Sequence, residues 1–273
     1  MAKRKTMSDL SYELVIGGLA TLGIIVLVLP VAIVLLTSFT TSASLKFPPP
    51  SLSVRWYEAL FDPVRSAHIH RAAWNSLSVA GSATLFAVVC SVLAALSISK
   101  IKSASARGLE AGFLSPLVLP TLAYGLATLI FFTLLGRRPS LMLLSIGHVV
   151  VIAPFIFRTS LASLTQLDPA LLEGSMSLGA TRFYTFRRVT LPIIAPGVIA
   201  GAFLAFIASL DNVPVSLFLS NARSDMLPIR MWGMMESTLD VRVAAISGVL
   251  IASVLVLMVV LERLVGLTKR MSG

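Results

Sequence analysis

Residues 168–192 read DPALLEGSMSLGATRFYTFRRVTLP and lie between two apolar segments. This stretch is polar and holds several signals for helix ends. Asp168 is a natural N-cap, and Pro169 follows it at the first helical position, where proline is best tolerated. Gly179 can end the first helix in a left-handed conformation that a side chain would resist. Because Thr181 can cap a second helix, the stretch predicts a short helix, a glycine corner and a new helix that enters a membrane.

Composition restricts the class of protein. The chain has 273 residues, of which 56% are hydrophobic and only 12% are charged, and its mean hydropathy is +0.92. An ordinary soluble domain has about 25% charged residues, so these values indicate a membrane protein. The net charge of +10 could suggest nucleic acid as a partner, but the basic residues are scattered over short segments between apolar runs. Cys90 is the only cysteine, which excludes an intrachain disulfide and a cysteine-based zinc site.

Six segments are apolar enough to be transmembrane helices. They are residues 14–45, 76–99, 111–135, 141–157, 189–210 and 243–261. The first run is too long and too β-branched for a signal peptide, so we expect an uncleaved span. Pro116 and Pro120 predict that the third run is bent or broken near its start. Residues 215–242 hold too many polar side chains to span.

Six spans place both termini on one side of the membrane. Placing them in the cytoplasm puts 13 Lys and Arg inside against nine outside, and the basic clusters before span one and after span two lie where orientation is decided. We therefore predict a single transmembrane domain, residues 14–265, between cytoplasmic tails 1–13 and 266–273. The loop of residues 168–188 is then also cytoplasmic.

The same loop carries a family resemblance. Glu173, Gly179 six positions later, and Val189-x-Leu191-Pro192 resemble the EAA motif of the permease subunits of binding-protein-dependent ABC importers. The two alanines of the motif are Gly174 and Ser175 here, and its isoleucine is Val189. In that family the loop forms a coupling helix that docks onto a cytoplasmic ATPase. The alternative for this chain is an ordinary loop whose glutamate and arginines are solvated. The resemblance implies a role in ATPase coupling for Asp168, Glu173, Gly174, Ser175, Gly179, Ala180, Arg182, Leu191 and Pro192.

Four further stretches are similar to the polyamine/opine-type branch of this family. They are SPLVLPTLAYGL, SIGHVVVIAPFIFRTSL, GVIAGAFLAFIASLDN and LPIRMW, which start at residues 115, 145, 197 and 227. The resemblance implies an all-α type I ABC importer permease with six transmembrane helices in the bacterial inner membrane. It also implies a second permease subunit, either a different chain, which we expect, or an identical one, with two ATP-binding subunits and a periplasmic binding protein as further partners and no nucleic acid.

The chain has no means of hydrolysing ATP itself. It lacks a G-x-x-x-x-G-K-[ST] phosphate loop, so we expect ATP and Mg²⁺ on the partner subunits and no cofactor on this chain. An ion-coupled secondary transporter is the alternative, but it would use acidic relays within its spans, and such residues are sparse here. A membrane-embedded enzyme would need a cluster such as H-E-x-x-H, which is absent.

Polar residues near the ends of the spans are candidates for the translocation pathway. Asp211 closes the fifth run and could meet a solute, a partner arginine or the water interface. For His148 a hydrogen bond inside the bundle is favoured over contact with the solute. The full candidate set is Asp211, Asn212, Trp232, Glu236, Arg242 and His148.

The same positions bear on the substrate. Polyamine-type relatives tend to carry an acidic pair where this chain has Asp211 and Asn212, and a glutamate where it has Arg242. A polyamine, an amino-acid derivative and an opine-like anion all remain possible substrates.

The fifth run also carries a packing signal. Its Gly197-x-x-x-Gly201 spacing predicts close approach of a neighbouring helix.

Overall fold

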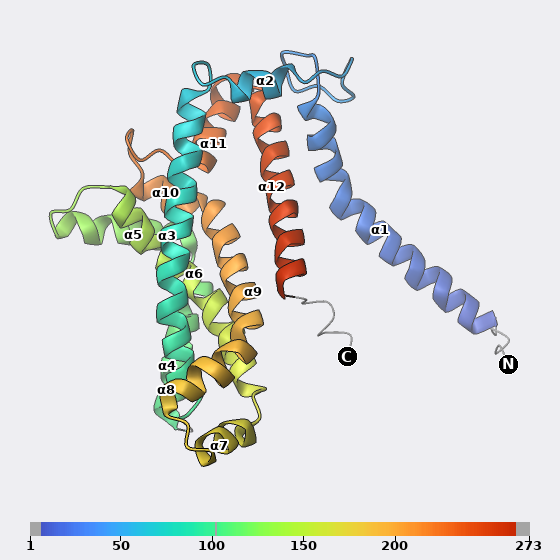
Figure 1. The fold of residues 1–273 in the computed structure, drawn as a ribbon. Coiled ribbons are helices and arrows are strands. Elements are labelled where there is room, and N and C mark those ends of the chain that lie inside the picture. The colour runs from blue at the N-terminus through green and yellow to red at the C-terminus, as the bar shows by residue number, and fades with distance from the viewer. Residues whose placement is uncertain (1–6, 102, 266–273) are drawn as a thin grey trace. The chain divides into compact units, whose positions relative to one another are not determined.

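The computed structural model describes residues 7–101 and 103–265, and every regular element in these ranges is a helix (Figure 1). The expected C-terminal tail and residues 1–6 of the expected N-terminal tail lie outside the described residues. In chain order the elements are α1 (Met7–Ser38), α2 (Arg55–Phe61), α3 (Ala67–Ile98), α4 (Ala104–Leu114), the 3₁₀ turn η1 (Ser115–Leu117), α5 (Thr121–Leu134), α6 (Leu141–Thr165), α7 (Pro169–Ser177), α8 (Arg182–Thr185), the π-helical segment η2 (Phe186–Thr190), α9 (Leu191–Leu210), α10 (Val213–Leu219), α11 (Leu227–Thr238) and α12 (Arg242–Val265).

The helices form two compact units. The first unit holds the described residues up to Ala67 together with Met234–Val256, and the second holds His68–Gly233 together with the described residues from Leu257 onward. The candidate coupling loop, Asp211 and His148 all belong to the second unit, whereas Arg242 belongs to the first. The candidate site residues are thus divided between two bodies.

Five helical stretches in the described residues are long and apolar enough to cross a membrane by themselves. They are Tyr12–Ser38, Ala67–Ile98, Leu141–Thr165, Arg182–Leu210 and Arg242–Arg263. The last three each contain a predicted span in full, the second contains residues 76–98 of the span 76–99, and the first ends at Ser38, so that residues 39–45 of the first predicted span lie outside it. Several of these helices continue past the apolar run: α3 begins at Ala67 rather than at residue 76, and α6 ends at Thr165 rather than at residue 157. A helix can continue into the interface because its backbone hydrogen bonds do not depend on the apolarity of its side chains.

The break predicted near the start of the third run, residues 111–135, is confirmed, and the helix before the break begins earlier, at Ala104. The chain forms α4 and η1 up to Leu117, breaks, and restarts as α5 at Thr121 with a bend of 100°. Pro116 and Pro120 lie at this break, and each removes a backbone N–H that a continuous helix would need. With 14 residues, α5 is about 21 Å long, which is short of the hydrocarbon thickness of a bilayer. Within the described residues, a sixth span can be counted only if this bent pair forms one.

In the second unit α6 and α9 pack along each other through the two glycines of α9 (Figure 1). A Cβ atom at Gly201 would lie 2.9 Å from Ile156 Cα, and one at Gly197 would lie 3.1 Å from the Thr159 carbonyl oxygen. Both distances are too short for an ordinary contact, so the backbones approach as closely as glycine allows. The close approach predicted from the Gly197–Gly201 spacing is confirmed, and the neighbour is α6.

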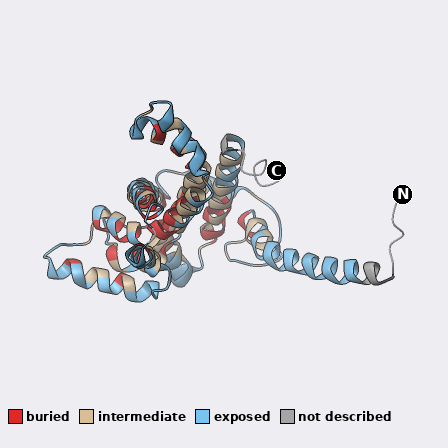
Figure 2. Ribbon diagram, turned by 90° about the horizontal axis from the view of Figure 1, so that it is seen from below, coloured by how far each residue is buried: buried red, intermediate tan, exposed pale blue. Residues whose placement is uncertain are grey.

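In the first unit the end of α1 is joined to α2. The Ser38 and Tyr57 hydroxyls lie 2.7 Å apart, and the Tyr57 ring packs on Phe39 with a centroid separation of 5.0 Å. Gly248 of α12 lies against the same tyrosine, where a side chain would collide with the hydroxyl. The rest of α1 is exposed along most of its length (Figure 2).

Candidate functional site

The candidate coupling loop begins with a capped helix. The Asp168 carboxylate accepts a hydrogen bond of 2.9 Å from the Ala170 backbone N–H, and Pro169 occupies the first position of α7. The N-cap and the proline at the first helical position are both confirmed. The cap satisfies a donor that a helix start would otherwise leave unpaired, so α7 has a defined beginning although it is only nine residues long.

The end of α7 is a Schellman corner at Gly179. The residue has φ of +85°, the left-handed conformation that the sequence predicted. The Gly179 N–H donates to the Met176 carbonyl at 2.9 Å, and the Ala180 N–H donates to the Ser175 carbonyl at 3.2 Å. These are the two bonds that define the motif. The chain direction therefore changes at a fixed point between α7 and α8.

A new helical stretch starts at once after this corner. Thr181 accepts a hydrogen bond from the Tyr184 N–H at 3.2 Å, which confirms the predicted cap. The backbone then passes through η2 before it continues as α9, so Arg187, Arg188 and Val189 lie in a π-helical segment. Sequence patterns did not predict this segment. Such segments occur often at functional sites.

A side-chain bond joins the two helices of the loop. The hydroxyls of Ser175 in α7 and Thr185 in α8 lie 2.9 Å apart, and Thr185 is buried. The family motif has alanine where this chain has Ser175, so the bond depends on a departure from that motif. No pattern in the sequence indicates this bond, because Thr185 is an ordinary residue in a polar stretch.

Several apolar side chains of the loop point away from the chain's own core. Leu178 is 90% exposed and Phe183 is 72% exposed, and Leu171, Met176 and Tyr184 are about half exposed. Glu173, Gly174 and Arg182 are exposed as well. In Figure 1 α7 lies at the end of the second unit that is remote from α10. The tip of this unit therefore offers an apolar surface mixed with charged side chains.

The other end of α9 carries Asp211. With 20 residues, α9 spans about 30 Å between the loop and this aspartate. Asp211 is exposed and terminates the helix. Asn212 is buried, and its side-chain oxygen accepts a hydrogen bond of 3.0 Å from the Val215 N–H, so it caps α10. The structure thus separates the predicted pair into an exposed acid and a buried helix cap.

His148 lies inside the second unit and is fully buried. Its Nδ1 is 2.8 Å from the Ser209 hydroxyl of α9, and its Nε2 is 3.3 Å from the Ser216 hydroxyl of α10. This is the hydrogen bonding inside the bundle that the sequence favoured for this histidine. The ring therefore connects α6 to the two helices that flank Asp211.

Trp232 and Glu236 are both exposed on α11. Their spacing of four residues places them on one face of the helix. The start of α11 is fastened to α3: the Ser76 hydroxyl accepts from the Leu227 N–H at 2.8 Å, and Asn75 donates to the Asp225 carbonyl at 2.9 Å. These two hydrogen bonds fix the part of α11 that precedes Trp232.

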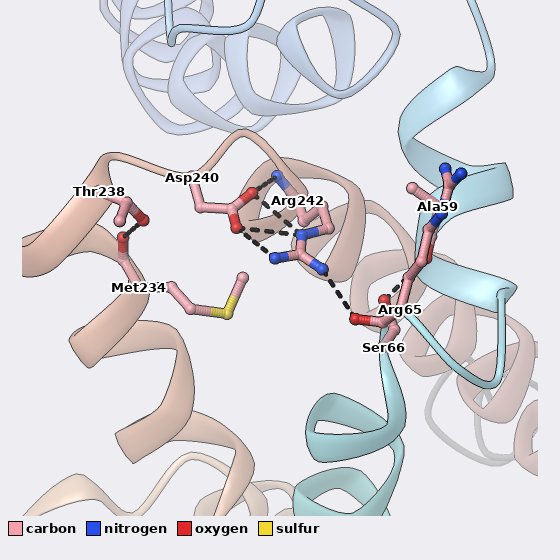
Figure 3. Close-up of polar contacts among 7 residues, drawn as sticks. All are labelled: Ala59, Arg65, Ser66, Met234, Thr238, Asp240 and Arg242. Atoms are coloured by element: carbon pink, nitrogen blue, oxygen red, sulfur yellow. Dashed lines mark hydrogen bonds and ion pairs between the residues drawn. The ribbon is translucent and has the colours of Figure 1, made fainter.

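The Arg242 side chain is held by an ion pair and a hydrogen bond to nearby groups (Figure 3). Its guanidinium binds the Asp240 carboxylate with a shortest distance of 2.7 Å and donates to the Arg65 carbonyl at 3.2 Å. Burial would raise the pKa of the Asp240 carboxyl, but the hydrogen bonds and charge of Arg242 outweigh this effect and hold the pKa below its ordinary value. The sequence marked Arg242 as a position where polyamine-type relatives tend to carry a glutamate, and in the structure its charge is paired with Asp240.

Curated relatives resemble this chain over most of its length. The spermidine/putrescine transport system permease protein PotC of Escherichia coli (strain K12) is 27% identical over 243 residues, which cover 89% of this chain and 90% of the relative. The putative 2-aminoethylphosphonate transport system permease protein PhnV of Salmonella typhi is 28% identical over 255 residues, covering 90% and 92%.

Solved structures show the same fold. A bacterial alginate ABC transporter, solved in complex with its alginate pentasaccharide-bound periplasmic protein, has a chain that matches with a TM-score of 0.71 at 17% identity, covering 95% of this chain and 96% of that one. The MetNI methionine ABC transporter in an inward-facing conformation matches with a TM-score of 0.59 at 20% identity, covering 72% and 94%.

The family model described as "binding-protein-dependent transport system inner membrane component" matches residues 87–270. This range contains the capped loop, the corner at Gly179, the glycine-lined α9 and the turn at Asp211. The chain belongs to this family, and it is an inner-membrane permease of an ABC importer.

Proposed function

We propose that this chain forms one half of a transmembrane pore and moves a small amine-containing solute from the periplasm to the cytoplasm by alternating access. In this proposal two partner subunits bind and hydrolyse ATP, and a periplasmic protein delivers the solute. Both termini and the loop of residues 168–188 face the cytoplasm. The observation that carries the proposal is the capped α7 helix, which presents an exposed apolar tip at the end of α9 opposite to Asp211.

The tip of the second unit has the properties of a docking element. Leu171, Met176 and Leu178 are exposed on or beside α7, and burying such side chains in a groove of a partner would contribute about 1.5–3 kcal/mol each. The Schellman corner and the Ser175–Thr185 bond fix α7 on α8. A force applied to α7 by closing ATPases would therefore be passed to α9 rather than absorbed by the loop.

Alternating access requires two arrangements of the pore that differ by a few kcal/mol, with each ligand favouring one of them. The long helix α9 is suited to carry the change, because it links the docking tip to Asp211. The α4–α5 break is a second place where the chain can rearrange without breaking the α6–α9 contact.

Two observations favour a substrate that carries an amino group. The curated relatives are named for spermidine and putrescine, and for 2-aminoethylphosphonate, and all three compounds carry an amino group. Asp211 is an exposed carboxylate at the end of a span, where it would attract an ammonium group. Arg242 is paired with Asp240, so it would repel an ammonium group less than a free guanidinium would.

Reconstitution tests the proposal. The chain is purified with a second permease, two ATPases and the binding protein, and is placed in liposomes with ATP inside. Uptake of radiolabelled putrescine, spermidine and 2-aminoethylphosphonate is then measured with and without the binding protein. We expect uptake of at least one of these amines that requires both ATP and the binding protein. Uptake driven by an ion gradient without ATP would contradict the proposal.

A further inference from the structure

We propose that His148 is a positioning residue, which holds the break between α9 and α10 so that Asp211 meets the translocated solute in a fixed geometry. This inference rests on the proposed role of Asp211. The ring of His148 is fully buried, and so are both serines that it contacts. Ser209 lies two residues before Asp211, and Ser216 lies four residues after Asn212. The imidazole therefore joins the two sides of the break directly.

The chemistry of the ring suits this role. A neutral imidazole has one N–H donor and one acceptor nitrogen, and a hydroxyl can serve as either. One serine therefore accepts from His148 and the other donates to it, so all three groups are paired without a net charge. Because both ring nitrogens are engaged, His148 cannot bind a solute without giving up a buried hydrogen bond. Its position favours a structural link over direct contact.

Packing around the ring fixes α10 by a second route. Gly147, the neighbour of His148 in α6, lies so close to α10 that a Cβ there would come within 2.8 Å of Leu219 and 3.1 Å of Val215. Gly125 of α5 lies against the Pro214 carbonyl oxygen, where a Cβ would come within 2.8 Å. These glycines let α10 pack closely against α5 and α6, and the hydrogen bonds of His148 link α10 to the end of α9.

The turn between the two helices leaves little freedom once both sides are held. The Val213 N–H donates to the Asp211 carbonyl at 2.9 Å, and Asn212 caps α10. With α9 and α10 joined through His148, the direction of the Asp211 side chain follows from the positions of the helices. Loss of the imidazole would free α10 from α9 and let this turn change shape.

The transport test uses the reconstituted complex and substitutions at His148. His148→Leu removes both hydrogen bonds at similar volume, and we expect the half-saturation concentration for substrate to rise roughly fivefold to tenfold while the maximal rate changes little. His148→Asn can keep the bond to Ser209 and should restore part of the affinity. Ser91→Ala is the matched control, because Ser91 is equally buried and bonds the Ala153 carbonyl at 3.1 Å, remote in sequence from the break.

A double substitution shows whether His148 acts through Asp211. We expect His148→Leu combined with Asp211→Asn to raise the half-saturation concentration no further than Asp211→Asn alone, because coupled residues are not additive. Where Asp211→Asn raises the half-saturation concentration, independent additive effects of the two substitutions, or no effect of His148→Leu, would overturn the positioning role.

Thiol labelling measures the geometry without using transport. An Asp211→Cys variant in a Cys90→Ser background is labelled by a water-soluble maleimide, with and without His148→Leu. A changed labelling rate supports positioning, and an unchanged rate overturns it. If the labelling rate changes but Asp211→Asn leaves half-saturation at the parental value, the positioning role stands and the proposed substrate contact of Asp211 fails.

Discussion

A single carboxylate carries the proposed recognition of the solute. Asp211→Asn keeps the shape and hydrogen bonding of the side chain but removes its charge. In a partly hydrated cavity we expect the loss of about 1–2 kcal/mol, which is roughly a fivefold to thirtyfold rise in the half-saturation concentration for uptake. Uptake is measured over a range of substrate concentrations in the reconstituted complex.

Two further measurements separate this effect from damage to the complex. Capture of substrate by the binding protein should not change, because that step precedes contact with the permease. ATPase activity stimulated by loaded binding protein should persist at saturating substrate. If uptake and ATPase activity both match the parent at all concentrations, Asp211 is structural, and the contact must be sought among Trp232, Glu236 and Arg242.

A second residue, Gly179, is predicted to matter through its backbone alone. Gly179→Val places a β-branched side chain at φ of +85°, which costs at least about 1–2 kcal/mol at the corner between α7 and α8. We expect the variant to reach the membrane in normal amount and to lose uptake. Uptake and membrane content are measured on the same vesicles.

Gly136→Val is the matched control for this substitution. Gly136 also has positive φ, of +67°, and a Cβ at either glycine would meet no other atom within 4 Å. Both variants therefore carry a similar backbone cost, but only one lies in the coupling loop. Equal uptake by the two variants would show that the corner has no special role.

What could be predicted for single residues depended on the distance to their partners along the chain. Asp168, Gly179 and Thr181 were assigned from sequence because their bonds are local: each cap bonds a backbone group two or three residues away. Ser175 pairs with Thr185 ten residues away, and His148 pairs with Ser209 sixty-one residues away. A pattern of residue types does not specify such pairs, since many serines and threonines could serve.

Among the elements, the α6–α9 pair depends on the absence of one side chain. A Cβ at Gly201 would lie 2.9 Å from Ile156 Cα, and a backbone atom cannot rotate away. We expect Gly201→Val to destabilise the protein by about 1–3 kcal/mol through overpacking. Gly81→Val in α3 is the control, because a Cβ there meets nothing within 4 Å. Thermal unfolding in detergent is measured for both, and equal midpoints would contradict the close contact.

The link between Asp240 and the start of α12 should depend on pH. The pKa of Asp240 is lower in the folded chain than in the unfolded chain, so the stabilisation is fully present above the ordinary carboxyl pKa and is lost as the pH falls through the lowered value. At pH 7 we expect Asp240→Asn to reduce stability by about 1–3 kcal/mol, since the bond partner is charged.

The comparison of the two proteins over pH makes this prediction specific. The difference in unfolding midpoint between parent and Asp240→Asn should be constant above about pH 4, which is the ordinary range of an aspartate, and should shrink in more acidic buffer. A difference that stays constant down to the most acidic condition in which the parent folds would show that the Arg242–Asp240 pair contributes nothing.

Among the elements, hydropathy predicted the existence of the spans more accurately than it predicted the residues at which they end. Charged and polar residues of α3 and α6 lie inside the helices although they lie outside the apolar runs. The third span shows a different limit. Pro116 and Pro120 predicted a bend or break, but a bend of 100° depends on which carbonyls other helices and water satisfy, and this is a property of the folded unit.

For the whole molecule, two exposed apolar surfaces, that of α1 and that of the tip at α7, bear differently on whether the chain works in an assembly. The most apolar window of the stretch Tyr12–Ser38 has no residue buried within the chain. Lipid can cover such a surface as well as protein can, because lipid tails are as apolar as leucine. The exposed apolar tip at α7 is different, since the sequence there is polar overall and the proposed orientation places it in water. In the proposed function, a protein partner covers that tip.

The composition of this assembly is the last prediction. In the proposed function, other subunits bind and hydrolyse ATP, as expected for a sequence that lacks a phosphate loop. We expect the affinity-tagged chain, purified in mild detergent from cells that express the whole system, to co-isolate with a second permease and two ATPases. The Gly179→Val variant should still retain the second permease, because its fault lies at the docking corner, but should lose the ATPases. Mass measurement of the intact complexes distinguishes these states. A single chain that transports with ATP by itself would contradict the proposed division of labour.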